Sequence, residues 1–318
     1  MIALWKSNPE AAAEQLMWGT ERVLTRRDFI KGFAGMVAAG GALAGYAFGL
    51  EPIWRLSIQR YRVQPRGWPA GMTLKIAAVA DLHACEPYMP VARIEEIVAT
   101  TNRLNADLIV LLGDFTAGHR FTTAPVPSAA WAKALSGLEA PLGVHAILGN
   151  HDWWDDRQAQ RARKGPPIAR RALENVGVPV YENSVVRLQH KGQPFWLAGL
   201  GDQIAFLLGR SMFQGVDDLD GTLAKVTDNA PVILLAHEPD IFTRVPARVS
   251  LTLSGHTHGG QVRLFGYSPV VPSRFGNRFA YGHVVENNRH LIVSGGLGCS
   301  IMPVRFGVPP EILEIQVG

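Results

Sequence analysis

Residues 74–83 read LKIAAVADLH, and this stretch decides the fold. The nearly unbroken apolar run from Leu74 to Ala80 is typical of a strand that is buried on both faces. Asp81 and His83 follow at the point where such a strand ends. Because residues two apart in extended backbone point to the same side, both side chains are expected on one side of the chain. The stretch therefore predicts a buried strand that carries two polar ligands at its carboxyl end.

The surrounding sequence repeats this strand at intervals filled by helix. Apolar residues at helical spacing predict a helix over 89–104, and apolar runs at 107–112 and 144–148 predict two further buried strands. Strand, helix and strand in this order indicate a layered α/β body. The second half predicts short strands at 178–181, 185–188, 195–199, 232–236, 251–254, 261–264, 291–294 and 312–317. We expect a four-layer αββα sandwich, with two facing mixed sheets flanked by helices, and a surface loop over 157–167.

Five separated clusters of metal-ligand side chains follow these strands. They are Asp81-Leu82-His83, Gly113-Asp114, Gly149-Asn150-His151-Asp152, His237 and Gly255-His256-Thr257-His258. Paired divalent ions held by His, Asp and Asn side chains are a common means of hydrolysing phosphate esters. One such motif alone is weak, whereas five in this order are specific. The remaining histidines lack this context and are expected to be structural or exposed: His119, His145, His190, His283 and His290.

These motifs resemble the calcineurin-like metallophosphoesterase superfamily, and the resemblance covers the chain from about Leu74 to its end. It implies the metallophosphoesterase fold and two divalent ions, of Mn, Fe or Zn, with a bridging hydroxide as the nucleophile. It also implies two ligand sets that share one carboxylate. The first set is Asp81, His83, Asp114 and His258, and the second is Asp114, Asn150, His237 and His256.

His151 lies beside a ligand but, by the same resemblance, is not one. It is expected to protonate the leaving oxygen or to stabilise charge in the transition state. Asp152 has two interpretations that stay open: it orients His151 as a catalytic partner, or it caps a turn. The prediction is that His151 and Asp152 are the catalytic residues.

Several later stretches resemble the exported bacterial phosphodiesterase branch: 255–263, 272–276, 296–298 and 303–311. The expected substrate is therefore a phosphodiester or pyrophosphate bond in an envelope-associated molecule, with Arg274 and Arg305 binding a second phosphate. Metal cages of this kind serve several substrates, so two alternatives stay open. One is an activity like that of UDP-diacylglucosamine pyrophosphatase, and the other is a non-catalytic, metal-containing cell-wall binding module.

The N-terminal residues resemble a twin-arginine export signal. Thr25-Arg26-Arg27-Asp28-Phe29-Ile30-Lys31 precedes an uncharged stretch, 32–50, that contains six glycines. Cleavage after export and retention as a membrane anchor both stay open. We expect an exported, periplasmic protein with the export machinery as a partner, and Met17 as a hypothetical true start. The predicted organisation is a signal or anchor over 1–50, a linker with an initial strand over 51–73, and a catalytic domain over 74–318.

Composition narrows the classes of partner. The 318 residues carry a formal net charge of only +4, and no dense basic run follows the N-terminal segment, so nucleic-acid binding is not expected. Two cysteines, Cys85 and Cys299, cannot make a disulfide framework, and unpaired thiols are the favoured interpretation. We expect a monomer that binds a phosphate-ester substrate.

Overall fold

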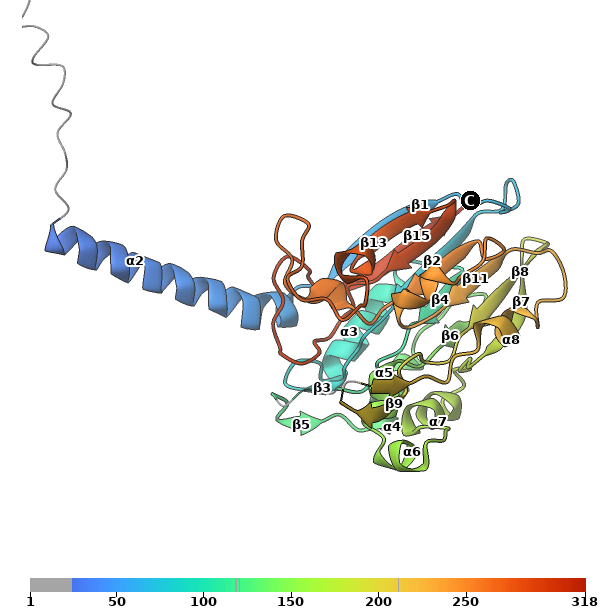
Figure 1. The fold of residues 1–318 in the computed structure, drawn as a ribbon, viewed down its shortest axis with the longest axis horizontal. Coiled ribbons are helices and arrows are strands. Elements are labelled where there is room, and N and C mark those ends of the chain that lie inside the picture. The colour runs from blue at the N-terminus through green and yellow to red at the C-terminus, as the bar shows by residue number, and fades with distance from the viewer. Residues whose placement is uncertain (1–24, 118, 120, 211) are drawn as a thin grey trace, which may run out of the picture. The chain divides into compact units, whose positions relative to one another are not determined.

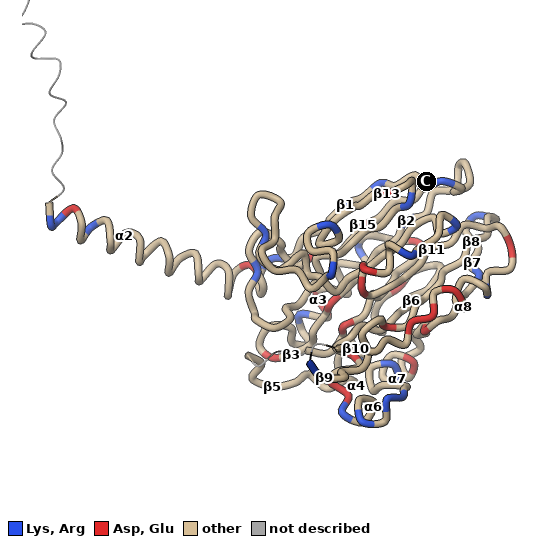
Figure 2. Tube along the Cα trace, in the orientation of Figure 1, with Lys and Arg blue, Asp and Glu red and all other residues tan. Residues whose placement is uncertain are grey.

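The computed structural model describes residues 25–117, 119, 121–210 and 212–318. The chain divides into two compact units, one ending at Gly45 and the other starting at Tyr46. The first unit contains helix α2 (Arg26–Gly45), which has no buried residue. Its charged residues are confined to its start, as Figure 2 shows. The residues ahead of Thr25, including Met17, lie outside the described residues.

Helix α2 continues in sequence into a π-helical segment, η1 (Tyr46–Trp54), which belongs to the second unit. Together, residues 26–54 are long and apolar enough to cross a membrane, judged by length and composition. A signal sequence satisfies the same test, so the alternatives of signal and anchor both stay open.

The first sheet of the second unit has five strands (Figure 1). Their order is β1 (Ser57–Val63), β15 (Glu311–Val317), β2 (Leu74–Val79), β4 (Leu108–Leu111) and β6 (Val144–Ala146). Strands β2, β4 and β6 run parallel, as βαβ connections require. The last strand of the chain, β15, pairs antiparallel to β2 and parallel to β1, so the sheet is mixed.

The second sheet has six strands. Their order is β13 (Gly282–Glu286), β14 (Arg289–Val293), β12 (Leu251–Ser254), β11 (Val232–Leu235), β8 (Gln193–Gly199) and β7 (Ser184–His190). The four central strands are parallel, and each outer strand is antiparallel to its neighbour. This sheet is also mixed, as the sequence predicts.

The alternating side chains of the strands establish the layers. Ile76 and Ala78 of β2 pack in one apolar cluster with Leu197 and Ile233 of the other sheet, so the two sheets face each other. The opposite face of β2 packs on α3 (Val91–Asn102), α4 (Ser128–Leu135) and α7 (Ile168–Asn175). The outer face of the second sheet packs on α8 (Leu219–Leu223) and η2 (Pro239–Thr243). The predicted four-layer α/β architecture is confirmed.

Three local predictions are wrong. Residues 157–167 are not all loop, because Asp156 accepts hydrogen bonds from the backbone N–H groups of Gln158 and Ala159 and so starts helix α6 (Arg157–Ala162). Residues 178–181 contain only a single bridge, from Val180 to Ala146, and residues 261–264 likewise form only bridges. Short apolar runs match a strand pattern even where no neighbouring strand pairs with them along their length.

Candidate metal centre

The candidate ligands lie after the carboxyl ends of parallel strands in both sheets. Asp81 follows β2, Asp114 follows β4, and α5 (Asn150–Trp154) begins shortly after β6. His237 and His256 follow the adjacent parallel strands β11 and β12. In α/β sheets, this edge is where ligands usually bind, because the loops of neighbouring parallel strands meet there.

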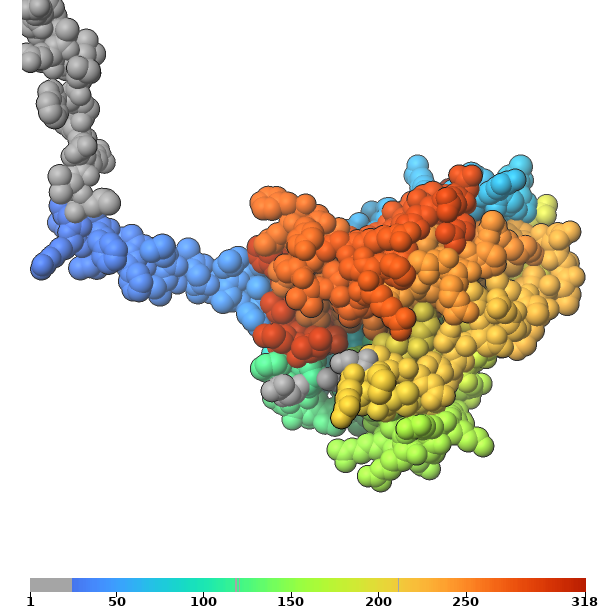
Figure 3. All heavy atoms as spheres, in the orientation of Figure 1, coloured from blue at the N-terminus to red at the C-terminus, as the bar shows by residue number. Residues whose placement is uncertain are grey.

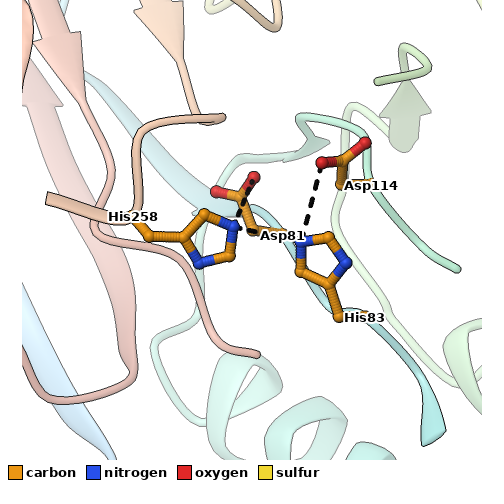
Figure 4. Close-up of side chains that lie close together, drawn as sticks. All are labelled: Asp81, His83, Asp114 and His258. Atoms are coloured by element: carbon orange, nitrogen blue, oxygen red, sulfur yellow. Dashed lines mark hydrogen bonds and ion pairs between the residues drawn. The ribbon is translucent and has the colours of Figure 1, made fainter. Parts of the chain in front are cut away.

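The first group of side chains is shown in Figure 4 and contains Asp81, His83, Asp114 and His258, all buried. One ligand atom from each lies within 4.8 Å of the others. The Nε2 atoms of His83 and His258 are 3.0 Å apart. Asp114 Oδ2 lies 3.6 Å from His83 Nε2, and Asp81 Oδ1 lies 3.6 Å from His258 Nε2. Four donors therefore converge on one small volume.

The second group shares Asp114 and adds His237 and His256. Asp114 Oδ2 lies 3.2 Å from His237 Nε2, so one carboxylate oxygen faces both groups. Asn150 Oδ1 lies 2.8 Å from His256 Nδ1, which brings the amide oxygen to the same place. The structure thus gathers all seven predicted ligands, and that each of them binds metal is a proposal.

The protein fixes which imidazole nitrogen faces inward. His83 Nδ1 lies 2.8 Å from the carbonyl oxygen of Thr116, and His237 Nδ1 lies 2.6 Å from that of Leu112. A carbonyl can only accept, so each Nδ1 carries a proton, and each Nε2 is the ring nitrogen that faces the centre. This arrangement is the usual one for a metal-ligating histidine.

Burial keeps three of the imidazoles neutral, as metal ligation requires. It lowers the pKa of His83 to about 3 and holds the pKa values of His256 and His258 below their ordinary value. Burial alone would likewise lower the pKa of His237, but nearby carboxylates, Asp114 first, raise it well above that value.

The pKa values of the Asp81 and Asp114 carboxyl groups shift in opposite directions, although both groups are buried. Burial raises the pKa of Asp81 to about 7. Burial would also raise the pKa of Asp114, yet its imidazole neighbours, led by His237, hold it well below its usual range. Asp114, which faces both groups, is therefore the carboxyl group that stays ionised.

Five of the seven candidate ligands have left-handed backbone: Asp81 (φ 54°), His83 (48°), Asp114 (57°), His256 (70°) and His258 (51°). For residues with a Cβ this conformation is sparsely populated and costs about 1–3 kcal/mol each. Such a concentration is retained only where the surrounding structure enforces it, and it is typical of functional sites.

Two features show that the pocket fits a cation. Asp81 Oδ2 is buried and has no hydrogen-bond partner among the described residues. A buried polar atom without a partner is unfavourable unless a ligand satisfies it. In addition, a Cβ at Gly296 would lie 2.7 Å from Asp81 Oδ2, and one at Gly149 would lie 2.4 Å from Asp114 Oδ1. Glycine at both positions leaves room for the ligand atoms.

His151 lies against this centre without joining either group. Its ring centroid is 5.0 Å from that of His83 and 5.3 Å from that of Trp154. Its Nε2 lies 3.3 Å from Ser300 Oγ, and its Nδ1 lies 3.6 Å from Asp155 Oδ2. Sequence reasoning missed Asp155 and Ser300, although the i,i+4 spacing of His151 and Asp155 on a helix was a usable signal.

Among the described residues, Asp152 makes no hydrogen bond to the His151 imidazole. Its Oδ2 accepts hydrogen bonds from the backbone N–H groups of Gly149 and Asp114, each at 2.9 Å, and its Oδ1 accepts one from Phe115 at 2.9 Å. The carboxylate therefore connects two ligand loops. Of the two interpretations of Asp152, the geometry matches the turn-capping one, and it does not support a catalytic role.

The two predicted substrate arginines lie in different environments. Arg305 has no exposed surface; its guanidinium donates to the carbonyl oxygens of Gly298 and Val308 and lies 3.3 Å from His258 Nδ1. The structure does not support substrate contact by Arg305, because a phosphate cannot reach it; the residue positions His258. Arg274 is exposed, and its backbone N–H donates to Asp240.

The remaining predicted residues carry no ligand role in the part of the chain that the structure describes. The other five histidines belong to neither ligand group. Cys85 and Cys299 are buried free thiols. Burial raises the pKa of Cys85 to about 11, which keeps this thiol protonated and unreactive at neutral pH.

Comparison with known proteins agrees with this centre. Residues 74–260 match the sequence profile described as calcineurin-like phosphoesterase. The uncharacterized metallophosphoesterase YkuE of Bacillus subtilis is 31% identical over 301 residues, which cover 91% of this chain and 96% of the relative. The phosphodiesterase YaeI of Escherichia coli is 26% identical over 93% of this chain and 100% of its own length. A transmembrane protein with metallophosphoesterase domain from Danio rerio is 28% identical over 76% of this chain and 52% of its own.

Metallophosphoesterases are hydrolases that use divalent metal ions, and the buried Asp and His donors supply a site able to bind them. The profile match spans more than half of the chain and includes every candidate ligand. On these grounds, the chain belongs to the calcineurin-like phosphoesterase family.

Proposed function

We propose that this hydrolase cleaves a phosphodiester or pyrophosphate bond in an envelope-associated molecule, and that it uses two divalent ions. The observation that carries the proposal is the position of Asp114 Oδ2, which faces both ligand groups. When bound about 3.5–4 Å apart, two ions activate water and neutralise charge on the phosphoryl oxygens. The manganese, iron or zinc alternatives stay open, because His, Asp and Asn donors suit all three.

Hydrogen bonds within the chain fix the position of Asp114, the proposed shared ligand. The backbone N–H of His151 donates to Asp114 Oδ1 at 2.8 Å, which leaves Oδ2 directed at the centre. The backbone N–H of Asp114 donates to Asp152 Oδ2, and this hydrogen bond fixes the backbone of Asp114. The same short helix, α5, therefore positions the shared carboxylate and presents His151 beside it.

His151 is our candidate general acid. Burial alone would lower its pKa, but Asp114 and Asp155 outweigh burial and raise it above the ordinary value, so the ring stays protonated to higher pH. Asp155 lies on the Nδ1 side, which leaves Nε2 as the atom that gives its proton to the departing oxygen. A positioned acid of this kind typically contributes 10²- to 10⁴-fold to the rate.

Two parts of this proposal concern substrate and location. Arg274, with its exposed side chain, is our candidate for contacting a second phosphate or another anionic part of the substrate. The basic start and apolar body of α2 support export through the twin-arginine machinery to the periplasmic side, with α2 as a signal or an anchor. Membrane-named relatives support the anchor.

A direct test compares a bis-aryl phosphate with the matching mono-aryl phosphate, using purified full chain loaded with manganese and metal content measured in the same sample. The proposal predicts that the diester is cleaved faster and that a chelator abolishes the reaction. If metal-replete protein cleaves only the mono-ester, the diester assignment is wrong. If it cleaves neither, the binding-module alternative gains support.

A further inference from the structure

Three segments of the second unit expose large apolar side chains, which we call the apolar platform. They are 46–54, 262–270 and 300–302, and their exposed residues are Phe48, Leu50, Trp54, Leu264, Phe265, Tyr267, Val270, Ile301 and Met302. Trp54 is 76% exposed, and Phe265 is fully exposed. Single exposed apolar residues are common on proteins, but a continuous group marks an interaction surface.

Backbone contacts join the three segments into one surface. Arg305 N donates to the carbonyl oxygen of Ala47 at 2.9 Å, and the Tyr46 and Phe306 rings meet edge to face at 5.9 Å. Phe306 in turn exchanges backbone hydrogen bonds with Gln261 and Arg263 at 2.8 Å. Figure 3 shows the orange and red surfaces of the later segments side by side, apart from the green surface of the helices near residues 157–175.

Within the platform segments and the residues that flank them in sequence, the exposed charges have one sign. Residues 46–56, 261–276 and 297–307 contain a single carboxylate, Glu51, which is 1% exposed and so does not reach solvent. Arg55 and Arg274 are exposed in the same stretches. Aromatic and aliphatic side chains flanked by arginine, without exposed acid, match the interface of a bilayer that contains anionic lipid.

Chain connectivity gives an independent reason for choosing a bilayer as the partner. Tyr46, the first residue of the platform's unit, directly follows α2, whose uncharged residues 32–45 span about 21 Å, less than the roughly 30 Å of a bilayer core. If α2 crosses a membrane, residues 46–50 therefore complete the apolar span, and the chain that follows them starts at the membrane surface. The other end of the platform adjoins the metal centre, because Ser300 Oγ lies 3.3 Å from His151 Nε2 and precedes Ile301.

We propose that the apolar platform docks onto an anionic lipid bilayer, so that the metal centre opens beside the membrane surface. Docking of the platform is separate from the chemistry proposed above and holds whichever phosphate bond is cleaved. It differs from simple anchoring by α2, because an anchored domain on a free tether would not bring Phe265 into the lipid.

The test uses the full chain reconstituted into vesicles of phosphatidylcholine and phosphatidylglycerol. Phe265→Cys carries an environment-sensitive fluorophore, and the vesicles contain lipid with a spin-label quencher near the headgroup. The native thiols do not interfere, because Cys85 and Cys299 are 1% and 3% exposed. Ile168→Cys on α7 is the matched control, since Ile168 is an apolar residue 47% exposed on another face. Ile301→Cys serves as a second platform site if Phe265→Cys folds poorly, which loss of a cooperative unfolding transition in urea would reveal.

The proposal predicts that labels at Phe265 and Ile301 shift to the blue and lose most of their emission to the quencher, whereas the Ile168 label does neither. Removing phosphatidylglycerol should reduce the effect at the platform sites. Equal quenching at all three sites, or none at any, would overturn the proposal. Concentration-dependent protection of the Phe265 label without lipid quenching would instead assign the surface to a second copy of the chain and would also overturn it.

Discussion

Replacing Gly149 by alanine tests the shared ligand with a single methyl group. The backbone at Gly149 is extended (φ −113°, ψ 179°), a conformation that any residue adopts, so alanine introduces no strain there. The added Cβ would instead lie 2.4 Å from Asp114 Oδ1 and 2.6 Å from His237 Nε2. The methyl group thus enters the space between the two ligands that define the second group.

The size of the effect follows from these distances. To reach an ordinary contact of about 3.4 Å, the Asp114 carboxylate or the backbone must move by about 1 Å. Metal sites tolerate only about 0.2 Å of error in ligand distance, and a 1 Å misplacement near the chemistry can cost about a hundredfold in rate. Overpacking a core costs about 1–3 kcal/mol, so the fold should survive.

The assay measures bound metal by mass spectrometry, bis-aryl phosphate turnover, and the free energy of unfolding in urea. Gly149→Ala should lose about a hundredfold in turnover and much of its metal, whereas its free energy of unfolding should fall by only about 1–3 kcal/mol. Gly49→Ala is the control, because a Cβ at Gly49 meets nothing within 4 Å. Wild-type metal content and turnover in Gly149→Ala would refute the placement of Asp114 and His237 as joint ligands.

Four further outcomes are expected. His151→Gln should retain its metal and lose about 10²- to 10⁴-fold in turnover, and normal turnover in this variant would rule out the acid role. Asp152→Asn should lower the free energy of unfolding by about 1–3 kcal/mol in urea titration, because the amide keeps only one of the two acceptor oxygens that bind the N–H groups of Gly149, Asp114 and Phe115; an unchanged free energy of unfolding would contradict the connecting role. Arg274→Ala should raise KM for an anionic diester with little change in kcat, and an unchanged KM would remove Arg274 from the site. Asp228 accepts from Trp196 Nε1 at 2.7 Å, an interaction that lowers its pKa from 3.8 to about 2. The ionised form therefore stabilises the fold above about pH 4, and this contribution is lost as pH falls toward 2. Asp228→Asn should thus lower the urea midpoint more at pH 6 than at pH 3, and an equal effect at both would contradict the linkage.

The fold was largely predictable because its central strands are buried on both faces. The runs at 74–80, 107–112 and 232–236 are long, apolar and followed by polar ligands, so both their type and their ends were visible in the sequence. The hairpin of β9 (Phe206–Gly209) and β10 (Met212–Gln214) was not predicted, because its side chains are mostly exposed and follow no period. Helix α6 was missed, although Asp156 is a start signal, because its six residues bury only Ala159 and so show no apolar period.

The sequence predicted which side chains gather at the centre, but it did not predict the groups that hold them in place. Spacing and residue type pointed to Asp81, His83 and the other ligands, and the structure gathers them. The left-handed backbone at five of them could not be predicted from residue type, because aspartate and histidine are enriched in this conformation but adopt it at only a minority of positions. The burial of Arg305 against His258 was equally hidden, because an arginine in a loop usually reaches solvent, and only tertiary packing encloses it.

The most direct test of the metal centre is anomalous diffraction from crystals of the full chain grown with manganese. Two anomalous peaks about 3.5–4 Å apart are expected, both within bonding distance of the Asp114 carboxylate. One peak should also lie beside His83 and His258, and the other beside His237 and His256. A single peak remote from Asp114, or no peak in protein that cleaves the diester, would contradict the account.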